Sequence, residues 1–173
     1  AGTELETGKG PDVGAAAGEI AGWVEAGGTL VGLASQGLDG VFGNDFHSMT
    51  PEPGSPYHHT ALMRFGSHPL TTGVCAPFFA EQSLPLFGPV RKAVPRGSEA
   101  RAWLHSLQDR QSDFPALTYR RVGCGHAYYF AFDLAQTMWV IHKGRPIDGD
   151  HDLDGYLRLS DAIATGSLPQ DVP

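Results

Sequence analysis

An acidic segment near the C-terminal end of the chain has the spacing of a calcium-binding loop. In residues 150–161, acids stand at loop positions one, three, five and twelve, and Gly155 stands at position six, where an EF-hand-type loop turns sharply. Ca²⁺ prefers six or more oxygen ligands, and this spacing wraps them around one point. The predicted ligands are Asp150, Asp152, Asp154, the backbone carbonyl of Tyr156, and Asp161.

The flanks of this segment leave a second interpretation open. The loop resembles dockerin-like loops, which also end in Asp and continue into a helix, as residues 161–164 would. Against calcium binding, residues 144–149 contain two glycines and a proline, so no clear helix enters the loop. The alternative is a solvated acidic turn in which Asp161 caps a short helix.

Eight histidines raise the question of a zinc site, because four of them surround one long Gly/Pro-rich region, residues 35–67. These four are His47, His58, His59 and His68. Zinc sites usually place two histidines one helical turn apart or in another recognisable spacing, and this region has none. Adjacent residues of an extended segment also point to opposite faces. We therefore expect surface or loop histidines.

Composition limits the classes of partner. The chain has 173 residues with 41% hydrophobic content, which suits one globular unit. Its formal net charge of -7 disfavours binding to nucleic acid or to an anionic membrane. No apolar run is long enough to span a bilayer, and residues 1–11 lack the layout of a secretion signal, so we expect a soluble protein of unknown compartment. Cys75 and Cys124 are compatible with one disulfide or with two free thiols.

The hydrophobic pattern predicts an α/β fold. Residues 10–26 have the three-and-four spacing of a helix, and the continuous apolar run 30–34 follows as a buried strand. Further strands are predicted at 61–65, 76–79, 102–104, 116–122 and 126–132, and a helix at 135–142. A doubly wound domain begins with a strand and residues 1–10 offer none, so we expect a fragment or a divergent start.

Three blocks resemble the class I glutamine-amidotransferase-like superfamily of bacterial carbohydrate-related and uncharacterised proteins. They are the helix, Gly27-Gly28 and strand up to residue 34; Ser-His-Pro-Leu-Thr-Thr-Gly at 67–73; and the glycine-rich turn and strand at 119–134. The resemblance implies a flavodoxin-like, mostly parallel sheet flanked by helices and lacking its first strand. It assigns residues 1–145 to this domain and residues 146–173 to an appended acidic loop and short helix.

The resemblance also implies where a reaction would take place. Catalytic relatives carry a cysteine on the turn after the strand that residues 30–34 resemble, and here that turn holds Ser35. Catalytic relatives also carry a histidine after the late strand, and in this chain Asp133 stands at the corresponding position. His68 would lie beside the same crevice, with Glu81 as a weaker candidate. An unassisted serine hydroxyl is a poor nucleophile, so a glutaminase is not expected.

These observations leave three functions. The first is a non-catalytic amidotransferase-like binding or structural module, a pseudoenzyme within a larger or multi-chain protein, whose partner is a protein or a small polar or carbohydrate ligand. The second is a hydrolase with a rebuilt site from Ser35, His68 and Asp133. The third is an interaction domain stabilised by Ca²⁺, for which no other cofactor is expected.

Overall fold

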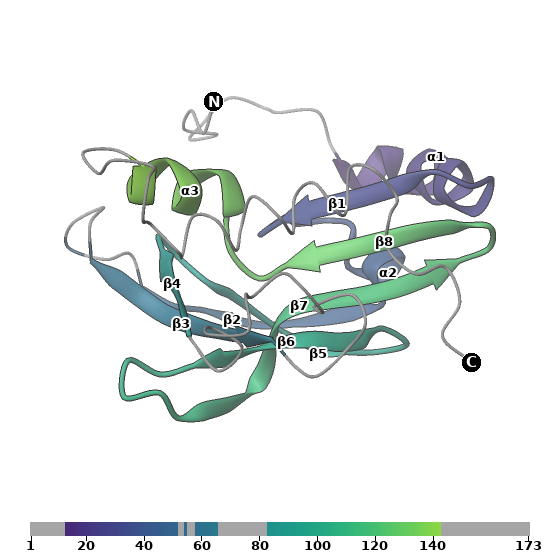
Figure 1. The fold of residues 1–173 in the computed structure, drawn as a ribbon. Coiled ribbons are helices and arrows are strands. Elements are labelled where there is room, and N and C mark those ends of the chain that lie inside the picture. The colour runs from purple at the N-terminus through teal and green to yellow at the C-terminus, as the bar shows by residue number, and fades with distance from the viewer. Residues whose placement is uncertain (1–12, 52–53, 55–57, 66–82, 143–173) are drawn as a thin grey trace.

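The computed structural model describes residues 13–51, 54, 58–65 and 83–142 (Figure 1). Three helices lie in this part of the chain: α1 (Val13–Glu25), α2 (Asp39–Phe42) and α3 (Leu134–His142). The strands are β1 (Thr29–Leu33), β2 (Asn44–Met49), β3 (His59–Phe65), β4 (Leu84–Phe87), β5 (Arg91–Pro95), β6 (Glu99–His105), β7 (Gln111–Val122) and β8 (Gly125–Phe130).

The described strands form two sheets. Six strands make a mixed sheet in the order β1-β8-β7-β6-β3-β4, and β2 and β5 pair as a separate antiparallel ribbon. Within the described sheets only β1 and β8 run parallel, with Thr29 opposite His126 and Leu33 opposite Phe130. Figure 1 shows the large sheet strongly curled, with α1 beside β1 and β8, α2 between β8 and the ribbon, and α3 next to β4.

The predicted fold class is therefore wrong. A flavodoxin-like sheet is mostly parallel, whereas the described pairs of β3, β4, β6, β7 and β8 are antiparallel and joined in part by hairpins. The physical reason is that β6, β7 and β8 follow one another across short turns, which only antiparallel neighbours allow. Parallel strands need a crossover connection of a dozen or more residues, and in the described sheets only β1 and β8, which have β2 to β7 between them in the chain, pair in this way.

Most individual elements were predicted even though their pairing was not. Segment 10–26 contains α1, segment 30–34 matches β1, and the aromatic segment 126–132 overlaps β8. The predictions at 61–65, 102–104, 116–122 and 135–142 fall on β3, β6, β7 and α3, and all of these are confirmed. Strand 76–79 and the predicted boundary at 145 lie outside the described residues. The elements that the pattern missed are α2, β2, β4 and β5.

The core lies between the curled sheet and its covering elements. Its largest fully buried side chains come from α2, β3, β4 and the end of β8: Phe42, Met63, Leu86, Phe130 and Phe132. The Phe130 and Phe132 rings meet edge to face with centroids 5.7 Å apart, a favoured aromatic geometry. Burial of this aromatic group stabilises the junction of β8 and the segment that leads to α3.

One close approach fixes α1 against the sheet. A Cβ on Gly125, the first residue of β8, would collide with the backbone carbonyl oxygens of Val24 and Gly28. The His126 N–H donates to the Gly28 carbonyl at 3.0 Å, and the Cys124 N–H donates to that of Glu25 at 2.9 Å. The end of α1 and the start of β8 are thus packed backbone to backbone, which requires glycine at position 125.

Candidate functional site

Ser35 follows the carboxyl end of β1, where the sequence predicted it. The residue in the unusual backbone conformation is its neighbour Ala34, with φ of 50°, a left-handed value that costs energy for a residue with a Cβ. The Ser35 Oγ turns back and accepts a hydrogen bond from the Leu33 N–H at 3.1 Å. Within the described part of the chain, no histidine hydrogen-bonds this hydroxyl. Its local role is to close the turn after β1.

Asp133 follows the end of β8 and precedes α3, so it lies at the same end of the parallel pair as Ser35. Its carboxylate Oδ1 accepts a hydrogen bond from the Gln136 N–H at 2.9 Å, and its backbone carbonyl accepts one from Thr137 at 3.0 Å. This is the geometry of a helix N-cap, the alternative that the sequence left open. His68 and Glu81 lie outside the described residues, so the three-residue hydrolase site stays a prediction.

A buried ion pair lies near this end of the parallel pair and was missed by the sequence interpretation. The Arg91 guanidinium of β5 binds both carboxylate oxygens of Asp39 at 2.7 and 3.0 Å, and also reaches the Tyr129 hydroxyl at 3.2 Å. It lies 4.5 Å from the centroid of the Phe46 ring. Burial alone would lower the pKa of Arg91, but the hydrogen bonds to Asp39 and Tyr129 outweigh burial and raise it. The pair ties the ribbon to α2 and β8.

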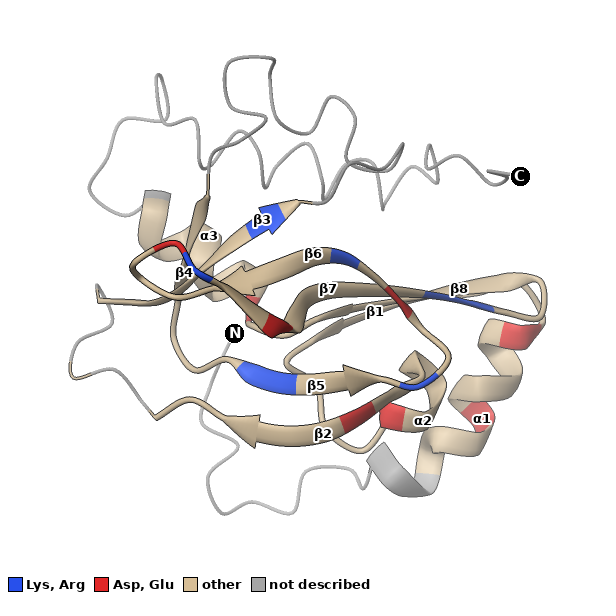
Figure 2. Ribbon diagram, turned by 90° about the horizontal axis from the view of Figure 1, so that it is seen from below, with Lys and Arg blue, Asp and Glu red and all other residues tan. Residues whose placement is uncertain are grey.

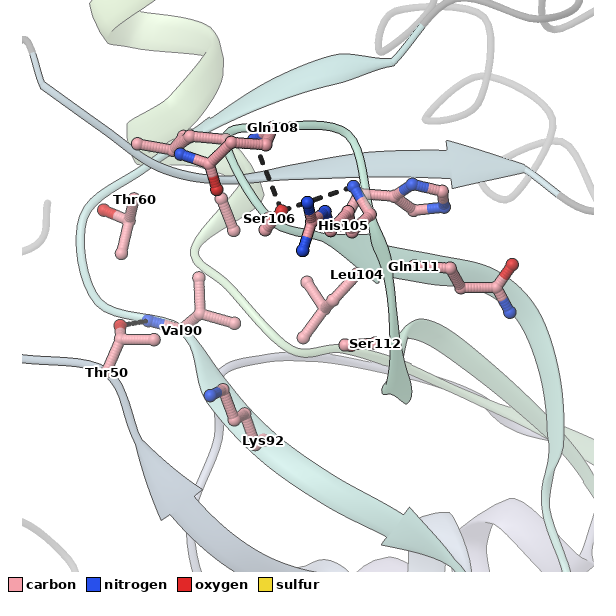
Figure 3. Close-up of a pocket in the computed structure, with 13 residues that line it drawn as sticks. Thr50, Thr60, Val90, Lys92, Leu104, His105, Ser106, Gln108, Gln111 and Ser112 are labelled. Carbon is pink, nitrogen blue, oxygen red and sulfur yellow. Dashed lines mark hydrogen bonds between the residues drawn. The ribbon is translucent and has the colours of Figure 1, made fainter.

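A hollow lies elsewhere among the described residues, beside the turn between β6 and β7 (Figure 3). This cavity has a volume of about 620 Å³. Figure 3 shows its labelled side chains coming from the end of β2, from β3, from β5 and from the β6–β7 turn. Thirteen residues line it: Thr50, Thr60, Ala61, Val90, Lys92, Leu104, His105, Ser106, Leu107, Gln108, Arg110, Gln111 and Ser112.

A network of hydrogen bonds shapes the turn that forms one wall of the cavity. The Ser106 N–H donates to the Arg110 carbonyl at 2.8 Å, and the Ser106 Oγ accepts from the N–H groups of Gln108 and Arg110 at 3.3 Å each. Asp109 takes the left-handed conformation at φ of 58°, which aspartate tolerates better than most residues. The turn therefore holds Gln108 and Arg110 in a defined arrangement.

Asp109 is held on the other side of this turn by three partners. The Ser83 hydroxyl donates to it at 2.6 Å, Arg64 pairs with it at 3.1 Å, and the ring of His105 contacts it at 3.1 Å. The hydrogen bond from Ser83 and the charge of Arg64 lower the pKa of Asp109. Its carboxylate is thus committed to these groups and does not line the cavity.

The chemistry of the lining is that of a binding site. Hydroxyls, amides and two basic side chains face the cavity, and none of its thirteen lining residues is an acid. The Thr60 hydroxyl is buried and has no hydrogen-bond partner among the described residues. A buried polar group without a partner costs free energy, and a ligand or ordered water at this position would satisfy it. No motif in the sequence marks these residues, which come from four separate segments.

The metal predictions have separate outcomes. Among the described residues, no group of three or more His, Cys, Asp and Glu side chains could hold a metal ion. His47, His58 and His59 are exposed, which confirms the surface interpretation for these three. The calcium loop at 150–161 lies outside the described residues and stays a prediction. Cys124 lies exposed in the β7–β8 turn, and Cys75 is outside the described residues.

The fold is similar to parts of known glycoside hydrolases. No protein-family model and no curated protein matches the sequence. Among solved structures, a β-galactosidase from Bacillus circulans sp. alkalophilus matches 87% of this chain with a TM-score of 0.57 and 16% identity. A β-galactosidase from Rahnella sp. R3 matches 88% with a TM-score of 0.56 and 16% identity. An exo-β-1,4-mannosidase from an Opitutaceae bacterium, strain TAV5, matches 83% with a TM-score of 0.52 and 15% identity.

These likenesses concern a portion of each enzyme. The chain spans 20%, 21% and 22% of the lengths of the three proteins, respectively. They establish a shared fold and correct the resemblance inferred from sequence: these three similar structures are glycoside hydrolases, and the mixed sheet is not that of a class I glutamine amidotransferase. The interpretation as a degenerate amidotransferase is therefore wrong. In the described residues, no helix combines the length and the apolar character needed to cross a membrane.

Proposed function

We propose that this chain is a non-catalytic module of a larger carbohydrate-related protein or assembly, and that it binds a polar saccharide in the cavity beside the β6–β7 turn. The observation that carries the proposal is the lining of that cavity, which offers many hydrogen-bonding groups and no carboxylate. Its volume of about 620 Å³ falls in the range usual for small-molecule sites. For brevity, we call this hollow the β6–β7 cavity.

The groups that line the β6–β7 cavity suit a sugar. A saccharide presents hydroxyls that donate and accept hydrogen bonds, and the side chains of Thr50, Thr60, Gln108 and Gln111 do both. Thr60 lines the cavity, and its buried hydroxyl has no hydrogen-bond partner among the described residues. The likeness to portions of two β-galactosidases and a mannosidase supports a carbohydrate setting.

The same lining argues against hydrolysis at this position. Most glycosidases use a pair of Asp or Glu residues on either side of the scissile bond, one as acid and one as base or nucleophile. None of the described residues that line the β6–β7 cavity is an Asp or Glu. At the end of the parallel pair, Ser35 bonds to the backbone and Asp133 caps α3. Ser35 and Asp133 are thus engaged in local structure, which supports a binding role.

The length relation supports membership of a larger protein. The structural match covers most of this chain but only about a fifth of each glycoside hydrolase that it resembles. In that setting, a module of this kind would hold a saccharide or a neighbouring domain while another part of the assembly reacts. This role is consistent with the absence of acids from the β6–β7 cavity.

The test combines binding with product analysis. The full chain is titrated calorimetrically with di- to tetrasaccharides of galactose, mannose and glucose and of their uronic acids, and each mixture is then incubated and analysed for shorter sugars. The proposal predicts saturable binding without cleavage. Absence of binding to every saccharide would overturn it. Release of shorter sugars that is lost in Ser35→Ala or Asp133→Asn would instead support the hydrolase predicted from the sequence.

A further inference from the structure

We propose that the β6–β7 cavity selects a saccharide that carries a carboxylate, such as a uronic acid residue, through Lys92 and Arg110. This inference rests on the proposed binding function and specifies its ligand. Both basic residues line the cavity, Lys92 from β5 and Arg110 from the β6–β7 turn. The lining thus carries two positive charges and no negative one, in a chain whose formal net charge is -7.

Among the described residues, neither the Lys92 side chain nor the Arg110 side chain binds an acid or a backbone carbonyl. The other basic residues of the described chain bind acids or backbone carbonyls: Arg64 pairs with Asp109, Arg91 with Asp39, Arg96 with Asp45 and Arg101 with Glu99, while Arg120 and Arg121 bind carbonyl oxygens. Two uncompensated cations at one cavity favour an anion, because each gains attraction without losing an existing partner.

The nearest acids do not neutralise the cavity. Asp109 precedes Arg110 but binds Ser83, Arg64 and His105. Asp113 follows the lining residue Ser112 on β7 and is exposed, but it is not part of the lining. Figure 2 shows basic residues on β5 and acidic and basic residues near one another at the neighbouring turn. A ligand carboxylate therefore meets Lys92 and Arg110 without an opposing acid in the lining.

Lys92 is positioned by aromatic packing. Its Nζ lies 5.6 Å from the centroid of the Phe114 ring, and that ring contacts the His47 ring at a tilt of 51°, with centroids 4.7 Å apart. A cation over a ring face is attracted by the ring, so the long lysine side chain is restrained before a ligand binds. Less side-chain freedom is then lost on binding, which favours affinity.

The lining combines basic side chains with neutral hydroxyl and amide side chains, and this combination suits a sugar that carries a carboxylate. The Arg110 guanidinium presents a planar set of donors that matches a carboxylate, and Lys92 adds a second charge. Thr50, Thr60 and Gln111 remain for the sugar hydroxyls. A neutral sugar would use only these last groups, so it would bind more weakly than its uronic acid counterpart.

The experiment measures dissociation constants for matched pairs of sugars. Galacturonic, glucuronic and mannuronic acid di- to tetrasaccharides are each titrated beside the neutral sugar of the same linkage, and a sulfated disaccharide separates carboxylate recognition from general anion attraction. We expect at least one uronate to bind about tenfold or more tightly than its neutral counterpart, as a charged hydrogen bond allows. Raising the salt concentration should reduce this preference.

Variants that remove one positive charge test which residues cause the preference for the uronate over the neutral sugar. Lys92→Gln and Arg110→Gln should each remove most of it, measured as the ratio of the dissociation constants of the neutral sugar and its uronate in the same variant. Arg96→Gln is the matched control, because it removes the same charge from an exposed site outside the lining. Equal binding of neutral and acidic sugars, a preference for the sulfated sugar over every uronate, or a loss in Arg96→Gln as large as in the two cavity variants would overturn this inference. These outcomes would leave the proposed saccharide binding intact. If no sugar binds at all, both the proposed binding and the proposed selection of a carboxylate are refuted.

Discussion

The buried ion pair of Arg91 and Asp39 allows a prediction with an unusual asymmetry. The side chain of Arg91 is 5% exposed and that of Asp39 is 28% exposed. Removing Asp39 leaves a cation buried without a counter-charge, whereas removing Arg91 leaves a carboxylate that water can reach. Removing one partner of a buried ion pair usually lowers the free energy of unfolding by about 3–5 kcal/mol. This full loss is expected only when the remaining charged side chain stays buried.

The two single variants should therefore differ in stability. We expect Asp39→Ala to lower the free energy of unfolding by about 3–5 kcal/mol, and Arg91→Met by about 2 kcal/mol, since methionine keeps part of the packing against Phe46. In the double variant the loss should be smaller than the sum, because the buried charge is gone. For a chain of this length, 3–5 kcal/mol lowers Tm by roughly 6–20 °C.

Urea unfolding followed by circular dichroism measures these differences. Asp45→Ala is the matched control, because Asp45 and its partner Arg96 are 63% and 69% exposed and such surface pairs contribute about 0–1 kcal/mol. The reasoning would be refuted if Asp39→Ala cost less than about 1 kcal/mol, or if Arg91→Met cost clearly more than Asp39→Ala.

Three further predictions concern the elements around the candidate sites. Gly125→Ala should destabilise the chain by several kcal/mol in urea, because its Cβ meets backbone that has no room to move; Gly22→Ala, in an open position of α1, should stabilise it by about 0.5–1 kcal/mol, and equal effects would contradict the packing. Asp133→Ala should cost about 1 kcal/mol through loss of the helix cap, and Asp133→Ser should restore most of it; no restoration would argue against capping. The pKa of Asp109 is lowered in the folded state, so its stabilisation is present above its unfolded pKa and is lost as the pH falls through the folded value. The stability difference between the native chain and Asp109→Asn should thus be larger at neutral pH than in acid, and a difference independent of pH would contradict this.

The hydrophobic pattern predicted the elements whose local signals are strong. Helix α1 has apolar residues at Ile20 and Val24 and ends at two glycines, and β8 is a run of aromatic residues after a glycine turn. By contrast, β4 has only four residues and contains Pro85, and β2 begins with the polar sequence Asn-Asp and pairs outside the main sheet. Short or polar strands carry little periodicity, so their existence depends on tertiary pairing.

The direction of the strands could not be read from the same pattern. The continuous apolar run at residues 30–34 was interpreted as one strand of a parallel sheet, and β1 does pair in parallel, but with β8 alone among the described strands. The predicted burial of this strand on both faces is wrong, because β1 lies at one end of the described sheet and Val31 is 39% exposed. The pairing of β6, β7 and β8 depends instead on the short turns between them, which make these strands antiparallel neighbours.

The β6–β7 cavity was also beyond sequence reasoning for a physical reason. Its lining comes from the end of β2, from β3, from β5 and from the β6–β7 turn. No recognisable sequence motif links any two of these segments. The residues that did attract attention, Ser35 and Asp133, were correctly placed near the ends of β1 and β8. Their contacts, a backbone hydrogen bond and a helix cap, are ordinary uses of serine and aspartate in turns.

A nuclear magnetic resonance titration of the ¹⁵N-labelled full chain with the best-binding saccharide tests the central claim most directly. Binding in the β6–β7 cavity predicts the largest amide shifts at residues 104–112 and at Thr60 and Lys92, with little change around Ser35 and Asp133. Shifts concentrated at Ser35 and Asp133, with the cavity residues unmoved, would contradict the account and return attention to the end of the parallel strand pair.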